Sequence, residues 1–549
     1  MAPTSKETET KKPRKSKDRA TEIANTFEWL ITAFILAFVF RAFVMEAFRI
    51  PTGSMADTLK GAHWRLRCPQ CGYKYDRGFM PGRMNPPLAQ DTVPPTEIPV
   101  KPSKCPSCAY LLNNGKFNPQ AKVNNGDRIL VLKCLYQIFD PKRWDVIVFK
   151  NPLKPTENYI KRLIALPNEK LEIVDGDVYI NGNIARKPPK VQQELWMPIY
   201  CNNYQPIHPE VRSFNYNRSQ WINPFSTIPS KWTIRPEDPT RLHLDGPANE
   251  VLSVHYDPST GNDFRASYAY NHAILFQHMP ECSDLMVEFY ATFHTPTGKV
   301  GAMLSKYGTE YRGWVDSNGQ MVLEKGPSNS PEVLNSVSIP ALTVGKPTKL
   351  RFENVDRLLT LTYGEEKISY DLNGSINSLK HNPERRAQVE LLGTGKLSLA
   401  HISIYRDIHY LNGSQRSGRN CRASEGNPFQ LNDDEFFVLG DNSPNSEDAR
   451  WWSAPLEASK GMQPPRAGIV PRDYLVGKAL FVYWPGGFRF PWSFPSLSPA
   501  SQNASLFRRI LRLRSIPNIG DMRFIYGGTS ENMAQQPSKN SGNNHPSDS

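Results

Sequence analysis

The most apolar stretch of the chain lies close to its N-terminus. Residues 29–40 read WLITAFILAFVF, and the apolar run continues to Met45 with a single charge at Arg41. These side chains surround the predicted helix on all sides, whereas the helix of a soluble domain usually carries an apolar stripe. The seventeen residues 29–45 span about 25 Å as a helix, slightly less than a hydrocarbon core of ~30 Å. A cleaved leader needs a small-x-small site, which Met45-Glu46-Ala47 lacks, so we expect an uncleaved membrane anchor.

The rest of the chain alternates short apolar runs with turn residues, which predicts a mainly β protein. Its 48 prolines favour strands and loops over helices. One strand is predicted over 158–166, and Pro167 ends it. Strand-like runs separated by Gly, Asn and Pro turns favour a β-sandwich further along, at 285–291, 349–352, 358–363 and 397–405.

The charge of the chain is compatible with a membrane and gives no sign of nucleic-acid binding. The formal net charge is +13, but lysines and arginines are spread along the chain and no nucleic-acid module is recognisable. Residues 1–20 carry seven Lys or Arg and three acids. By the positive-inside rule this basic tail stays in the cytoplasm, and everything after about residue 47 lies on the outer face.

A serine directly after the anchor is a candidate nucleophile. Ser54 follows Pro51-Thr52-Gly53, a turn sequence that exposes a hydroxyl and leaves backbone N–H groups free. A serine needs a base, and the chain has eleven histidines but no Gly-x-Ser-x-Gly elbow. A neutral lysine can serve, but lowering its pKa by about 3 units takes roughly 4–5 kcal/mol of desolvation.

Lys161 is the best candidate for such a base. Period-two alternation places it between Tyr159 and Leu163 on one face of the predicted strand, a desolvating position, while Arg162 points the other way. The simpler interpretation is a solvated strand lysine.

A polar loop follows the predicted strand 436–439 and contains further candidates. Within Gly440 to Arg450 (GDNSPNSEDAR), Asp448 and Arg450 can form an ion pair, and Ser446 can hydrogen-bond a neutral lysine and orient it. An ordinary surface turn is the alternative.

In this order the segments resemble bacterial type I signal peptidases. The matching motifs are the anchor, Pro51 to Met55, Gly126 to Val131, Arg143 to Phe149, Tyr159 to Arg162, Gly440 to Arg450 and Val470 to Pro485. Two departures are Ala165-Leu166-Pro167-Asn168-Glu169, where the family usually has Gly-Leu-Pro-Gly-Asp, and Ser443-Pro444, where a charged pair is common.

The resemblance implies a serine endopeptidase that needs no cofactor for catalysis. Ser54 attacks the scissile carbonyl and forms an acyl-enzyme, and Lys161 takes its proton and later activates water. The Ser54 N–H and the Thr52 hydroxyl form the oxyanion hole. Ser446 orients Lys161, while Asp448 and Arg450 hold their loop. Substrates are exported preproteins with small residues at −1 and −3, and the location is the bacterial cytoplasmic membrane, crossed once.

Four of the eight cysteines form two C-x2-C pairs, Cys68-Cys71 and Cys105-Cys108. This spacing resembles a zinc ribbon, in which two knuckles supply four thiolates to a structural, tetrahedral zinc site. Two disulfides are the alternative, because an oxidising exterior favours them.

These features predict a signal-peptidase-type, β-barrel-like catalytic core that is interrupted twice. The segments are a basic tail (1–26), the anchor (27–46), core (47–66), a zinc-ribbon-like insertion (67–112), core (113–200), a laminin-G- or concanavalin-like jelly-roll sandwich (201–430), core (431–500) and a partly disordered basic and polar tail (501–549). An aromatic cluster at 484–494 belongs to the membrane interface or to the core.

The inserted sandwich binds a glycan or a protein, or serves only as structure. We expect that replacing residues 205–425 with a short linker leaves an active protease, because tolerated insertions enter and leave a domain at nearby points. The rival function is a membrane-anchored binding protein in which the sandwich and the ribbon are the working parts.

Overall fold

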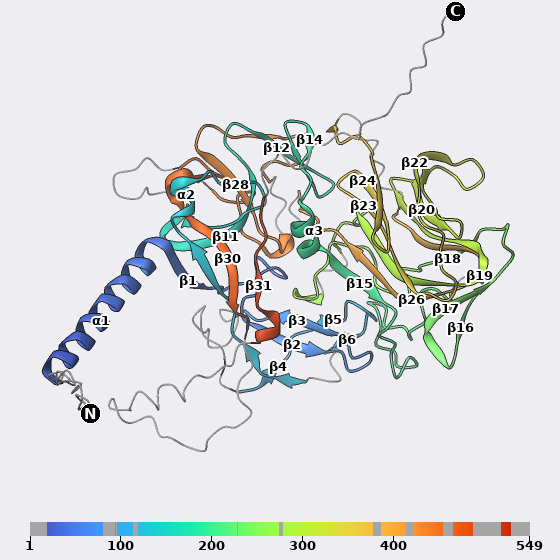
Figure 1. Ribbon diagram of the computed structural model, residues 1–549, viewed down its shortest axis with the longest axis horizontal. Helices are drawn as coiled ribbons and strands as arrows, with labels where there is room; N and C mark the ends of the chain where they lie inside the picture. The colour runs from blue at the N-terminus through green and yellow to red at the C-terminus, as the bar shows by residue number, and fades with distance from the viewer. Residues whose placement is uncertain are drawn as a thin grey trace, which may run out of the picture.

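A computed structural model of the chain is mainly β, which confirms the predicted fold class (Figure 1). It describes residues 19–80, 94, 96–112, 119–227, 229–273, 278–376, 386–412, 421–453, 465–486 and 518–528. Most of the basic tail, most of the aromatic cluster at 484–494 and most of the segment 501–549 lie outside these residues, so the predictions made for them stay predictions.

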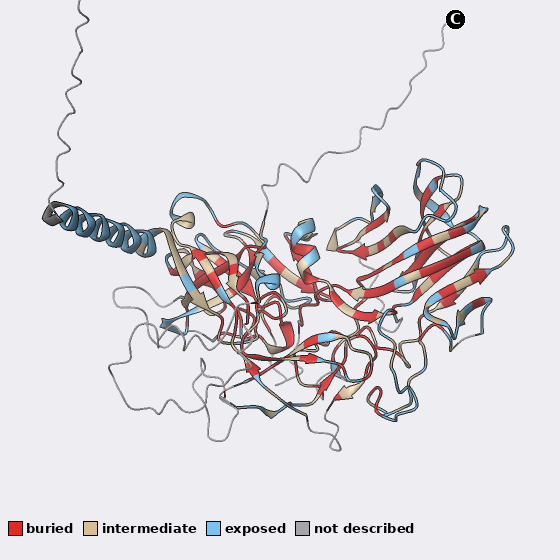
Figure 2. Ribbon diagram, turned by 60° about the horizontal axis from the view of Figure 1, so that its bottom comes forward, coloured by how far each residue is buried: buried red, intermediate tan, exposed pale blue. Residues whose placement is uncertain are grey.

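The N-terminal helix is longer than the apolar pattern predicts. α1 (Arg19–Val39) continues into a π-helical turn, η1 (Phe40–Val44). The stretch Glu22–Val44 has 23 residues and is long and apolar enough to cross a membrane. At 1.5 Å per residue it covers about 34 Å, which removes the shortfall of the 17-residue estimate. None of its side chains is buried, and it projects from the end of the molecule opposite the sandwich (Figures 1 and 2).

The segments predicted to form the catalytic core build an open, eight-stranded sheet that begins directly after the N-terminal helix. Its central strands are buried on both faces because their sequences are almost continuously apolar, as in VIVFKN of β10. In spatial order the strands are β1 (Met45–Arg49), β9 (Arg128–Leu132), β30 (Leu475–Trp484), β10 (Val146–Asn151), β11 (Lys154–Ala165), β28 (Glu435–Leu439) and β29 (Val470–Pro471), with β31 (Arg523–Phe524) beside β30.

A small four-stranded sheet and short helices complete this part of the molecule. The sheet shares a hydrophobic core with β10, β11 and β28. Its strands are β14 (Asn183–Ile184), β13 (Asp177–Ile180), β12 (Lys170–Val174) and β27 (Phe429–Gln430). The helices are α2 (Leu135–Ile138), α3 (Pro189–Leu195) and the 3-10 turns η5 (Ser443–Asn445), η6 (Arg472–Tyr474) and η7 (Ile519–Asp521).

The cysteine-containing insertion forms short antiparallel hairpins beneath the core (Figure 1). One three-stranded sheet carries the first cysteine pair and a two-stranded ladder carries the second. The strands are β2 (His63–Arg67), β3 (Lys74–Gly78) and β8 (Val123–Asn124), then β5 (Ser103–Lys104) with β6 (Leu111–Leu112), and β4 (Ile98–Pro99) with β7 (Gln120–Ala121).

The second insertion is a β-sandwich, as the strand pattern predicts. Two long strands, β19 (Leu285–Lys306) and β26 (Val389–Arg406), pair with each other and bridge both layers. Alternate residues of the two layers, such as Leu323 and Leu361, meet in one apolar core. The other strands are β15 (Met197–Cys201), β16 (Trp232–Arg235), β17 (Asp238–Asp245), β18 (Leu252–His255), β20 (Thr309–Asp316), β21 (Gln320–Lys325), β22 (Glu332–Ser338), β23 (Thr348–Val355), β24 (Leu358–Tyr363) and β25 (Glu366–Asp371).

The insertion 201–430 is not packed as a separate body throughout. Ile408, Tyr410 and Ala423 are buried in the hydrophobic core that includes β10, β11 and β28, and not in that of the sandwich. The sandwich therefore gives way to core structure at about the end of β26. Removing residues 205–425 would take these apolar side chains out of that core, which argues against the expectation that the shortened chain stays active.

Candidate active site

Ser54 lies in a turn that is held at both ends by Asp127. The backbone of Ile50, before the serine, donates to the Asp127 carbonyl (2.8 Å), and the Lys60 N–H, after it, donates to the Asp127 carboxylate (2.9 Å). Gly126 is needed beside it, because a Cβ there would lie 2.0 Å from the Ile50 carbonyl oxygen. A Gly-Asp pair far along the chain therefore shapes the turn that carries the candidate nucleophile.

Lys161 lies where the strand pattern predicts, and it contacts Ser54. It sits in β11 opposite Ile147 of β10, and its Nζ donates a hydrogen bond of 2.8 Å to Ser54 Oγ. The Tyr159 ring lies 5.5 Å from Nζ, on the same face of the strand. Both members of the pair are buried, Ser54 at 8% exposed and Lys161 at 4%, so the interpretation as a solvated lysine is wrong.

Burial also changes the proton affinity of this lysine. Desolvation lowers the pKa of Lys161 from 10.5 to about 8, and it outweighs the opposing effect of the Asp448 and Asp441 carboxylates. A lysine of this kind is neutral in a useful fraction of molecules near neutral pH, and it can then accept a proton from the hydroxyl that it contacts.

The predicted Asp448–Arg450 pair forms inside the core. The two groups are fully buried and make two parallel bonds, from Arg450 Nε to Asp448 Oδ1 (2.8 Å) and from a terminal nitrogen to Oδ2 (2.7 Å). Asp448 also accepts from the Gly440 N–H (3.1 Å), and Arg450 donates to the Leu411 carbonyl (2.7 Å). The pair therefore ties the loop to itself and to the end of the insertion.

A second buried ion pair is not found by the sequence reasoning. Arg162, on the face of β11 opposite Lys161, makes a two-bond contact with Asp441 (2.8 and 2.7 Å), and neither residue is exposed. The strand pattern predicts that Arg162 points away from Lys161, and Asp441 lies inside the Gly-Asp-Asn motif. The ion pair could not be predicted because it depends on the pairing of β11 with β28, two strands that are far apart in the sequence.

Thr52 and Ser446 are the remaining residues predicted for the site. The Thr52 side chain is exposed beside Ser54. Ser446 Oγ is buried and has no hydrogen-bond partner among the described residues, so the predicted bond to Lys161 is not formed in this structure. Its hydroxyl packs instead against Gly440, where a Cβ would lie 2.2 Å away. Their roles stay predictions.

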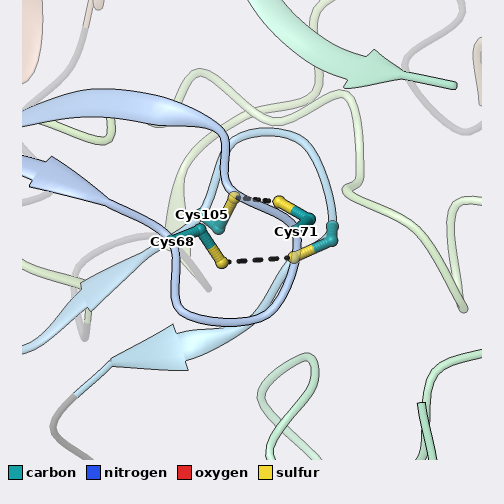
Figure 3. A group of neighbouring side chains, drawn as sticks. Cys68, Cys71 and Cys105 are labelled. Atoms are coloured by element: carbon teal, nitrogen blue, oxygen red, sulfur yellow. Dashed lines mark hydrogen bonds between the residues drawn. The ribbon is translucent and has the colours of Figure 1, made fainter. Parts of the chain in front are cut away.

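The four paired cysteines converge on one point (Figure 3). All four sulfurs lie within 4.8 Å of one another, with Cys68 Sγ 3.6 Å from Cys108 Sγ and Cys71 Sγ 3.7 Å from Cys105 Sγ. A disulfide has a sulfur separation of about 2.0 Å, and the eight cysteines are free thiols. Tetrahedral zinc with bonds of about 2.3 Å needs sulfurs about 3.8 Å apart, so the four thiols fit a metal ion.

The two halves of this cluster repeat the same turn. In each half, the backbone N–H of the first cysteine donates a hydrogen bond of 2.9 Å to the carbonyl of a tyrosine five positions later. The pairs are Cys68 with Tyr73 and Cys105 with Tyr110. The residues after the second cysteines, Gly72 and Ala109, have left-handed backbones with φ of 75° and 62°. Two equivalent knuckles facing each other are the arrangement that the C-x2-C spacing predicts.

Known proteins resemble the core segments of this chain. Residues 112–207 and 384–484 match the family "Signal peptidase, peptidase S26". The chain is 28% identical over 156 residues to a signal peptidase I of Rickettsia canadensis, covering 28% of this chain and 42% of the relative. It is 37% identical over 93 residues to signal peptidase I of Pseudomonas fluorescens, covering 16% of this chain and 33% of the relative. The chain therefore spans less than half the length of these curated relatives.

The sandwich has only a distant structural likeness. A carbohydrate-binding module, CBM66 from Bacillus subtilis, aligns with 33% of this chain and 89% of its own at 13% identity, with a TM-score of 0.19. At this TM-score the likeness supports no statement about the insertion. The family match, in contrast, covers both Lys161 and the loop from Gly440 to Arg450, so these segments of the chain resemble the family "Signal peptidase, peptidase S26".

Proposed function

We propose that this chain is a membrane-anchored signal peptidase I that cleaves signal peptides from exported preproteins with a Ser54–Lys161 dyad. The observation that carries the proposal is the 2.8 Å hydrogen bond between two buried side chains, Lys161 Nζ and Ser54 Oγ.

The chemistry follows from the geometry of the pair. Neutral Lys161 removes the Ser54 hydroxyl proton as Oγ attacks the scissile carbonyl, and the resulting ammonium returns a proton to the leaving amine. A water molecule then loses a proton to Lys161, attacks the acyl-enzyme, and releases the new carboxylate with Ser54 restored.

Two groups are proposed to stabilise the oxyanion. Among the described residues the Ser54 N–H has no hydrogen-bond acceptor, so it is available as a donor. The Thr52 hydroxyl, exposed two residues earlier, is the proposed second donor. Ser446, Asp448 and Arg450 support the lysine and its loop.

The helix Glu22–Val44 is proposed to anchor the enzyme in the bacterial cytoplasmic membrane, with the N-terminus in the cytoplasm and the core on the outer face. Substrates are then preproteins with small residues at −1 and −3.

The functional test is incubation of the detergent-solubilised full chain with a preprotein that carries an Ala-x-Ala site. Cleavage after this site supports the proposal, whereas binding without cleavage favours the rival function of an anchored binding protein.

The pKa of Lys161 gives a prediction for pH dependence. Since the lysine acts only when neutral, kcat/KM should rise about tenfold per pH unit below an apparent pKa near 8 and become level above it. The measurement is kcat/KM for a short peptide substrate from pH 6 to pH 10. A profile that stays level over this range, with chemistry rate-limiting, would argue against a lysine base.

We also propose that the four-cysteine cluster holds one structural zinc ion. Four thiolates fill a tetrahedral site, which leaves no position for a substrate, so the ion would stabilise the insertion and take no part in cleavage.

Replacing Cys68 and Cys105 together with serine should remove this metal. We expect about one zinc per chain in the parent protein and none in the variant, with lower thermal stability, because metal binding supplies folding free energy to such a site. Elemental analysis of the purified protein is the measurement. A matched control is Cys134→Ser, a thiol outside the cluster. Two mapped disulfides and no metal would replace the zinc site with the oxidised alternative.

A further inference from the structure

The sandwich insertion sends one segment, residues 266–273, into the active site. Ala56, two residues after the nucleophile, is fully buried in a small apolar cluster with Tyr268 and Tyr270 of this segment. These contacts lie outside the segments that match known signal peptidases.

We infer that this segment is a positioning element for the nucleophile, in which Asn271 fixes the side-chain amide of Asn442 and, through it, the main chain at Ser54. The inference rests on the proposed function.

The link between Asn271 and the nucleophile is a pair of asparagine amides. Asn271 Nδ2 donates to Asn442 Oδ1 (2.7 Å), and Asn442 Nδ2 donates back to Asn271 Oδ1 (2.8 Å). Asn442 Nδ2 also donates to the Gly53 carbonyl (2.9 Å), and its backbone N–H donates to the Ser54 carbonyl (3.0 Å). Both asparagines are buried. Without Asn271, the Asn442 amide keeps only its bond to the Gly53 carbonyl, so two of the three bonds that fix its orientation are lost.

Two tyrosines of the same segment contact the site from either side of this amide pair. The Tyr268 hydroxyl donates to the Asp441 carbonyl (2.9 Å), directly before Asn442. The Tyr270 ring packs over Gly53, where a Cβ would lie 2.2 Å from the ring, and its hydroxyl donates to the Ala62 carbonyl (3.2 Å). The segment therefore contacts both loops that must stay in register for Lys161 to reach Ser54.

The same segment joins the nucleophile turn to the cysteine insertion. The Gly78 N–H and an Arg77 guanidinium nitrogen, both on β3, donate to the Tyr270 carbonyl at 2.9 and 2.8 Å. Tyr270 therefore lies between the nucleophile turn and the hairpin that carries the first cysteine pair. The insertion therefore contacts the site directly and is not only attached to the surface of the core.

The test is a double-mutant cycle on the full chain in detergent, with a preprotein substrate. Asn271→Ala should lower kcat by about 10- to 100-fold with little change in KM, since misplacing a reacting group by about 1 Å costs a factor of this size. If Asn271 acts through Asn442, the double variant Asn271→Ala/Asn442→Ala should be no slower than Asn442→Ala alone. Asn203→Ala is the matched control, because that exposed amide of the insertion bonds to His401 on the sandwich surface.

A second pair of variants removes only a hydroxyl, which guards against loss of folding. Tyr268→Phe should lower kcat about fivefold, the value of one neutral hydrogen bond. Tyr256→Phe, which removes a buried hydroxyl bond to Asn262 within the sandwich (2.9 Å), should leave kcat unchanged.

Three results would overturn the inference. The losses in kcat from Asn271→Ala and Asn442→Ala could multiply in the double variant, or Asn271→Ala could change KM alone. Asn271→Ala could also lower the melting temperature while its kcat, measured well below melting, stays at the parental value. A parent protein that does not cleave the preprotein would instead overturn the proposed function itself.

Discussion

Ser54→Ala and Lys161→Ala should each lower the rate of preprotein cleavage by at least about 10⁴-fold, because loss of either member of a nucleophile–base pair removes the same step. The two side chains form a single hydrogen-bonded unit of 2.8 Å, so the double variant should be no slower than either single one. Single-turnover cleavage of a preprotein with an Ala-x-Ala site is the measurement.

Lys161→Arg sharpens this prediction. Arginine keeps the positive charge but cannot lose its proton in a protein, so it should be as inactive as alanine if the lysine acts as a base. If Lys161 only supplied a positive charge, the arginine variant would retain much of the parental rate.

Matched controls exist for both residues. Lys154→Ala removes an exposed lysine from the same strand, paired with Glu157 at 2.5 Å, and Ser226→Ala removes an exposed serine hydroxyl. Both should cleave at the parental rate. A near-parental rate for Lys161→Ala would show that the base has been assigned to the wrong residue.

Features that depend on a few neighbouring residues could be predicted from the sequence. Period-two alternation was enough to place Lys161 beside Tyr159 and away from Arg162, and the C-x2-C spacing was enough to predict two facing knuckles. Such patterns are local, since a strand or a tight turn fixes where its own side chains point.

Features that depend on distant partners could not be predicted. The amide of Asn271 meets that of Asn442 across 171 positions, and Arg162 meets Asp441 across 279. No pattern within a single sequence distinguishes these residues from other buried polar groups. The same limit explains why the sandwich was expected to be removable: its strand pattern predicts a core of its own, but it does not show that residues 266–273 contact the turn that carries Ser54.

A buried ionic cluster joins the sandwich to the small sheet of the catalytic core. Lys306 of β19 contacts Asp284, and it lies 3.6 Å from Asp177 of β13. Lys187, before α3, lies 2.5 Å from Asp356 and 2.8 Å from Asp407. The four carboxylates lie within 4.8 Å of one another and all are buried, so each lysine is needed to compensate charge that water cannot reach.

The protonation of this cluster depends on the contact between Lys306 and Asp284. Burial alone would lower the pKa of Lys306, but the Asp284 and Asp177 carboxylates outweigh it and raise that pKa well above its usual value. Burial alone would raise the pKa of Asp284, but the Lys306 ammonium outweighs it and holds that pKa below its usual value. At neutral pH both groups are therefore charged and paired.

Lys306→Met should destabilise the folded protein by about 3–5 kcal/mol at pH 8, because it leaves a buried carboxylate unpaired while it keeps the apolar volume of the side chain. The exposed pair of Lys325 with Glu332 (3.0 Å) gives the control, and Lys325→Met should change stability by no more than about 0.5 kcal/mol.

The loss of stability in Lys306→Met should depend on pH. Without Lys306 the folded-state pKa of Asp284 rises above its unfolded value, so the loss should be present at pH 8. It should shrink as the pH falls toward 5 and the carboxyl binds a proton. Urea unfolding of the full chain at both pH values measures this. Equal stability of the two lysine variants at pH 8 would mean that apolar packing alone holds the sandwich on the core.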